Sequence, residues 1–115
     1  MSFLRKKVVE LDGATVTVSG LTGEQVDRFL SRQAEIKQMG EGDERTRFEK
    51  AKAFTEFSEQ FVADCINNAT GETNGNKMTS ERVHKEFDRG FVTHLVSVCL
   101  DMSKLGGGEG NATSA

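Results

Sequence analysis

The feature that most constrains this sequence is the absence of proline from its 115 residues, which leaves twelve glycines as the main breaks between elements. The glycines cluster at 13–23, 40–42, 71–75 and 106–110. Between these clusters, apolar residues recur at helical spacing. We therefore predict a mainly α-helical chain, with a single domain over residues 1–105 and a flexible, Gly-rich tail over 106–115.

Residues 5–19 carry the pattern of a β-hairpin. Apolar and polar residues alternate on both sides of Asp12-Gly13, and the apolar ones are Val9, Leu11, Val16 and Val18. Asp-Gly is a strong hairpin signal, because Gly supplies the positive φ that a tight primed turn needs. We predict strands over about 5–11 and 14–19. Since a lone hairpin is marginal in water, it must pack on helices or pair with another chain.

Two amphipathic helices are predicted after the hairpin. Thr22 is a good N-cap, and Gln25 three residues later completes a capping box. This first helix should end near Met39, because Gly40 and Gly42 follow. The second helix should run from a cap at Asp43 to about Asn68.

The second helix carries an unusually wide apolar arc. One stripe runs along it, flanked near its two borders by Phe48 and Phe57, and the stripe consists of Ala51, Phe54, Phe61, Val62 and Cys65. The arc approaches half of the helix circumference. That width is more than a helix needs to pack on one neighbour.

A third helix is predicted after a polar loop over 67–78. It begins at Thr79 or Ser80 and keeps its apolar spacing through Leu105. Gly90 lies inside this stretch and marks a candidate bend, or a break after Asp88. The predicted fold is thus a hairpin and three amphipathic helices, the third with a possible break near Gly90.

The polar loop resembles a calcium-binding EF-hand loop if Thr70 takes its first position and Glu81 its twelfth. Two departures count against calcium. Thr70 replaces the aspartate that anchors the ion, and Lys77 takes the usual apolar eighth position. We expect a plain connection between helices, with no metal and no cofactor.

The two histidines do not form a catalytic pattern. His84 and His94 are ten residues apart and fall on different faces of a helix. Asp88, four residues after His84, favours an exposed ion pair between those two. No Ser or Cys lies at nucleophile–base spacing from either histidine, so we expect a protein that is not an enzyme.

Charge and cysteine usage narrow the class of protein further. The net charge is −3, and no basic face stands out, which argues against nucleic acid as a partner. No apolar run is long enough for a membrane span or a secretory signal. Cys65 and Cys99 lie among apolar residues, so we expect buried free thiols in a reducing compartment; a disulfide or redox pair is the alternative.

The positive signal is apolar surface. The wide arc of the second helix, the Phe-rich third helix and a hairpin with an open edge offer more contact surface than three short elements easily cover. The candidate partner-binding residues are Phe48, Phe57, Phe61 and Phe91. A core would also use most of these side chains.

The N-terminal third resembles the tail assembly chaperones of long-tailed bacteriophages. The resemblance rests on the run Val8-Val9-Glu10-Leu11-Asp12-Gly13-Ala14-Thr15-Val16-Thr17-Val18, on Gly20-Leu21-Thr22-Gly23, and on the amphipathic helix that follows. The chain length and the Gly-rich end are similar to that family as well. The detailed likeness covers residues 8–30.

The resemblance implies a function. Such chaperones bind the tape measure protein, keep its apolar surface soluble and help to recruit tail tube subunits; they act in the host cytoplasm and are absent from the mature virion. They self-associate, and many have a longer product made by a ribosomal frameshift, to which Gly106-Gly107-Gly108 could correspond. The alternatives are a minor structural or connector protein of a phage tail and a small regulatory binding domain.

Overall fold

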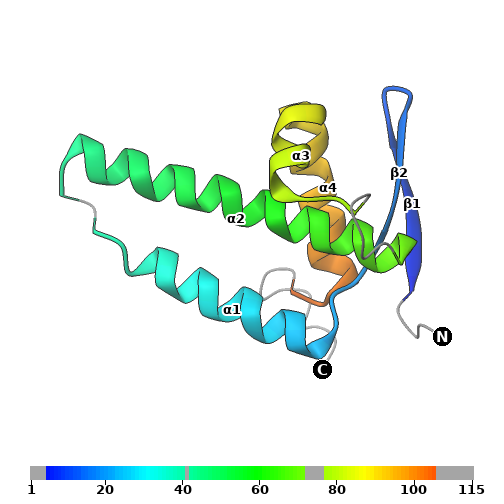
Figure 1. The fold of residues 1–115 in the computed structure, drawn as a ribbon, viewed down its shortest axis with the longest axis horizontal. Helices are drawn as coiled ribbons and strands as arrows, with labels where there is room; N and C mark the ends of the chain where they lie inside the picture. The colour runs from blue at the N-terminus through cyan, green and yellow to red at the C-terminus, as the bar shows by residue number, and fades with distance from the viewer. Residues whose placement is uncertain (1–4, 41, 72–76, 106–115) are drawn as a thin grey trace.

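The computed structural model describes residues 5–40, 42–71 and 77–105. A β-hairpin comes first, formed by β1 (Lys6–Leu11) and β2 (Ala14–Ser19). Four helices follow, and they are α1 (Gly23–Lys37), α2 (Glu44–Thr70), α3 (Ser80–Glu86) and α4 (Arg89–Met102). In Figure 1, α1 and the first half of α2 form a two-helix arm that extends away from a body built of α3, α4, the hairpin and the end of α2. The predicted tail lies outside the described residues.

The predicted hairpin is present, with its turn at the expected position. Its strands are antiparallel, and Leu11 pairs with Ala14 next to the turn. Asp12 and Gly13 both have positive φ, of 52° and 88°, as a type I′ turn requires. The hairpin packs on the helices within the chain, since Val9 and Val18 are buried in the main core.

Each of the two helices of the arm begins at its predicted cap. The Thr22 hydroxyl accepts a hydrogen bond from the Gln25 backbone N–H, and the Gln25 side chain accepts one from the Thr22 N–H. The Asp43 carboxylate caps α2 in the same way, by accepting from the Thr46 N–H at 2.8 Å. The two helices are held by a small cluster around Phe57.

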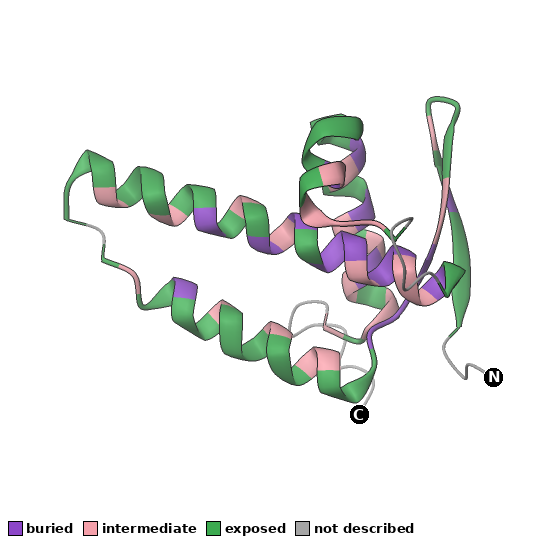
Figure 2. Ribbon diagram, viewed as in Figure 1, coloured by how far each residue is buried: buried purple, intermediate pink, exposed green. Residues whose placement is uncertain are grey.

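The body holds the main core. Figure 2 shows that buried residues gather where the second half of α2 passes α4 and the hairpin, whereas most of the arm is exposed. The most completely buried side chains in this part are Val18, Val62, Cys65, Val83, Leu95 and Cys99. One half of α2 thus belongs to the body and the other half to the arm.

The structure has four helices where the sequence predicted three. The predicted third helix breaks at Phe87, whose backbone is extended (φ −107°, ψ 138°). The break has a local cause: the Asp88 carboxylate accepts a hydrogen bond from the Phe91 N–H at 2.9 Å and so begins a new helix. Phe87 still reaches the core, because its ring stacks on that of Phe91. The break therefore lies two to three residues before Gly90.

A polar junction ties the arm to the body. The Asn68 side-chain amide, on α2, donates to the Gly20 carbonyl at 2.9 Å and to Gln25 Oε1 at 2.7 Å. The end of α4 closes the junction from the other side, where Ser103 Oγ accepts from the Leu21 N–H. Gly20 is required here, since a Cβ on it would lie 2.7 Å from the Met102 carbonyl oxygen.

Candidate partner-binding surface

The first half of α2 carries an exposed apolar face. Phe48 is 67% exposed and Phe54 is 55% exposed, which is unusual for side chains of this size. Ala51 lies between them on the same side of the helix, since positions three apart are neighbours on a helix surface. The same half packs on α1 through Ala53 and Phe57, and the Phe57 ring adjoins that of Phe54.

The structure divides the predicted stripe. Ala51 and Phe54 are exposed, whereas Phe61, Val62 and Cys65 of the same stripe are buried. The reason is that α2 has different neighbours along its length. Near its start it meets α1 on one side, and further on it meets β2, α3 and α4 on others. The wide apolar arc therefore has three parts: one is buried against α1, one is buried in the body, and one is exposed.

A cleft continues the exposed face toward the body. It lies between α2 and α4, has a volume of about 340 Å³, and is lined on the α2 side by Phe54, Thr55 and Ser58. Its other wall combines the apolar side chains of Phe87, Val92 and Val96 with polar ones from His84, Arg89 and Thr93. Phe54 belongs to both features, so the exposed face and the cleft form one surface. We call this continuous surface, from Phe48 to Val96, the α2 face.

One buried carboxylate borders the cleft. The side chain of Glu59 is 10% exposed, and its Oε2 lies 2.8 Å from Nδ1 of His84. The expected partner of His84 was Asp88, but Asp88 serves as the cap of α4. Glu59 lies 25 positions before His84, so helical spacing could not have indicated this contact.

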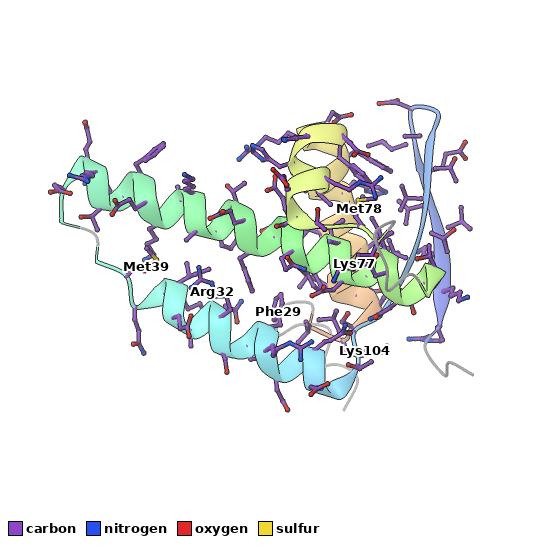
Figure 3. The ribbon with its side chains drawn as sticks, in the orientation of Figure 1. Phe29, Arg32, Met39, Lys77, Met78 and Lys104 are labelled. Atoms are coloured by element: carbon purple, nitrogen blue, oxygen red, sulfur yellow. The ribbon has the colours of Figure 1, made fainter. Side chains whose placement is uncertain are left out.

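A second cleft lies between the two helices of the arm. Figure 3 shows Phe29, Arg32 and Met39 on the side of α1 and its following loop that faces α2. The cleft has a volume of about 420 Å³ and an aromatic floor, where the ring of Phe29 lies 4.7 Å from that of Phe57 and 4.8 Å from that of Phe61. These rings hold the arm together, which gives the cleft a structural role.

The four candidate partner-binding residues fall in two groups. Phe48 is exposed on the α2 face. Phe57, Phe61 and Phe91 are buried within the chain, where they join α1 to α2 and α4 to the core. Phe54, which the sequence interpretation placed in the apolar stripe but not among the candidates, is exposed beside Phe48. The positions of the neighbouring elements distinguish these phenylalanines, and the sequence does not give those positions.

Within the described part of the chain, no group of His, Cys, Asp and Glu side chains is arranged as a metal ion needs. Positions 72–76 of the calcium-like loop lie outside the described residues. No helix in the described ranges is both long enough and apolar enough to cross a membrane.

The two cysteines are buried free thiols, as predicted. They come from different helices, α2 and α4, and both belong to the main core. The Cys99 thiol and burial together raise the pKa of Cys65 far above its ordinary value. A thiol held in its protonated form is a poor nucleophile, so this pair serves the packing of α2 on α4.

Comparison of the chain with protein-family models, with curated proteins and with solved structures finds no match.

Proposed function

We propose that this protein is a tail assembly chaperone, which binds apolar helical segments of a tape measure protein on its α2 face. The observation that carries the proposal is the exposure of Phe48 and Phe54 beside an open cleft that is partly apolar. Grooves of this kind take the apolar side of an amphipathic helix. The hairpin and the capped helix on which the family resemblance rests are both present in the fold.

The energetics favour weak contacts that are repeated. Full burial of a Phe side chain contributes roughly 1.5–3 kcal/mol, and association costs offset much of that gain. A surface built on two such side chains therefore binds a single segment weakly. Several copies along one long helical partner add up to stable coverage, which is the reason to propose a self-associating chaperone. Tail tube subunits would then be recruited to the coated partner.

The direct test is co-expression with the tape measure protein of the same phage. We expect the wild-type chain to keep that protein soluble and to co-purify with it. The double variant Phe48→Ser, Phe54→Ser should lose both effects while its melting temperature stays close to that of the wild type. The matched control is Val8→Thr, since Val8 is 62% exposed on the hairpin and outside the α2 face.

Two outcomes would contradict the proposal. One is a soluble tape measure protein with the double variant, which would remove the α2 face from the function. The other is the presence of this chain in purified virions in structural amounts. A chaperone acts in the host cytoplasm and leaves before the virion is complete, so that result would favour the alternative of a connector or minor tail protein.

A further inference from the structure

Basic side chains border the α2 face. At about 100° per residue, Arg47 lies about 40° from Ala51 on one side of the helix axis, and Lys52 lies about 100° from it on the other. Both side chains are exposed. Arg89, also exposed, lines the cleft at the start of α4. Positive charge is therefore present beyond the Phe48 edge of the apolar stripe, within the stripe on its Phe54 side, and at the cleft.

The acidic residues of the same region are placed differently. Glu49 and Glu56 lie about 160° and 140° from Ala51, on the far side of α2. Glu59 is buried and paired with His84 at 2.8 Å, so its charge is largely withdrawn from the surface. Glu44 is the exception: it lies about 20° from Ala51, within the angular range of the stripe, but in the first turn of α2, where it suits the helix dipole. The surface charge that a partner meets beside Phe48 and Phe54 is mainly positive.

We infer that the α2 face binds an amphipathic helix whose apolar stripe is bordered by Asp and Glu. This inference rests on the proposed function and specifies the chemistry of the partner segment. The apolar side chains of that helix would enter the cleft beside Phe54, and its carboxylates would meet Arg47, Lys52 and Arg89. Charge at the rim of an interface steers association and fixes orientation more than it adds affinity. Here it would favour acidic partner helices over basic ones.

The shape of the α2 face favours a helix over a lipid surface. The cleft is a hollow between two helices with walls on both sides, and its residues Val92 and Val96 are only partly exposed. A bilayer cannot enter such a hollow, whereas side chains at positions i and i+4 of a helix can. An anionic membrane, which would also be attracted by Arg47 and Lys52, is included in the test as a competing occupant.

The test uses two designed helical peptides of about five turns. They share one Leu stripe and differ only in their flanking residues, which are Glu in one and Lys in the other. Binding to the full-length protein is measured by fluorescence anisotropy at low and high salt. We expect the Glu-flanked peptide to bind about tenfold more tightly than the Lys-flanked one at low salt, and the difference to shrink as salt screens the rim charges.

Charge-reversal variants locate the effect. Arg47→Glu with Lys52→Glu should reverse the preference between the two peptides, and helix formation should survive because Glu is a good helix former. The matched control is Lys6→Glu with Lys37→Glu, which changes the net charge equally at exposed positions away from the α2 face. That control should bind the Glu-flanked peptide more than the Lys-flanked one, as the wild type does.

Several results would overturn the inference. One is binding of the Lys-flanked peptide that equals or exceeds that of the Glu-flanked peptide. Another is binding to phosphatidylserine vesicles without binding to either peptide. A third is a dimer, seen in sedimentation, that the double variant Phe48→Ser, Phe54→Ser dissociates, when neither peptide binds. If the tape measure protein still needs Phe48 and Phe54 but the Lys-flanked peptide binds better, only the inference about charge fails. If the Glu-flanked peptide binds better but the tape measure protein stays insoluble, only the proposed function fails.

Discussion

At the scale of single residues, Asp64 shows how the fold changes the chemistry of one group. It is half-buried at the cleft between α1 and α2, where Gln60 Nε2 donates to its Oδ1 at 3.0 Å. Burial raises the pKa of the Asp64 carboxyl, against the opposing effects of the Gln60 hydrogen bond and of the Arg28 and Lys77 charges. Folding therefore makes the Asp64 carboxyl easier to protonate than it is in the unfolded chain.

We expect Asp64→Asn to raise the melting temperature at neutral pH by a few degrees at most, since solvent screens a half-exposed group. Because the folded-state pKa lies above the ordinary value of 3.8, the stabilising contribution of Asp64 is full below that value and lost as pH rises through the folded-state pKa. The gain should thus vanish in acid. Thermal melts across pH check this, with Asp27→Asn, at an exposed position, as the control. A gain that persists in acid would contradict the assignment.

Gly20 occupies a position where the structure leaves no room for a side chain. Gly20→Ala places a methyl group 2.7 Å from a backbone oxygen of Met102, so either β2 or the end of α4 must move. We expect a loss of about 1–3 kcal/mol in the free energy of unfolding, measured by urea denaturation. Gly23→Ala is the control, because nothing lies within 4 Å of its added Cβ. Equal stability of the two variants would show that the α4 end does not contact the hairpin as described.

At the scale of elements, boundaries were predicted well wherever a local signal existed. The caps at Thr22 and Asp43 and the turn at Asp12-Gly13 all occur where the sequence placed them, and α3 begins at Ser80, one of the two predicted starts. Each depends on a side chain that bonds to backbone within three residues, or on a local φ. The number of helices was wrong because the apolar spacing continues across the break, while the Asp88 cap interrupts the backbone.

We expect Asp88→Ala to cost about 1 kcal/mol of stability, since it removes the acceptor for the Phe91 N–H. Hydrogen exchange should accelerate at the first turn of α4 more than in α2. Asp88→Asn keeps an acceptor oxygen and should restore most of the stability. If Asp88→Ala and Asp88→Asn behave alike, the cap does not define the break between α3 and α4.

At the scale of the whole molecule, the arm and the body differ in how they are held. α1 packs chiefly on α2, through a short set of contacts around Phe29, Phe57 and Ile36. The body is held by a continuous core from both strands and three helices. Local stability follows the density of buried contacts, so the arm should open more readily than the body.

We expect backbone amides of α1 to exchange with solvent faster than those of α4 in the native protein. Phe29→Ala should widen this difference, because it removes the ring that contacts both Phe57 and Phe61. Leu95→Ala, in the body, should instead lower global stability by about 2–5 kcal/mol. Hydrogen-exchange mass spectrometry separates the two, and uniform protection across α1 and α4 would argue against a separate arm.

The sequence by itself determined the hairpin, the helix caps and the buried thiols. The hairpin turn and the caps depend on residues that are close along the chain, and each cysteine lies among apolar residues in the sequence. Only the tertiary structure decided which phenylalanines are buried. Phe54 and Phe57 lie three residues apart on one apolar arc, yet Phe57 packs on α1 and Phe54 faces outward. Helical periodicity reports that an arc is apolar, but the positions of the neighbouring helices decide which part of it they cover. The proposed partner surface is the part that they leave open.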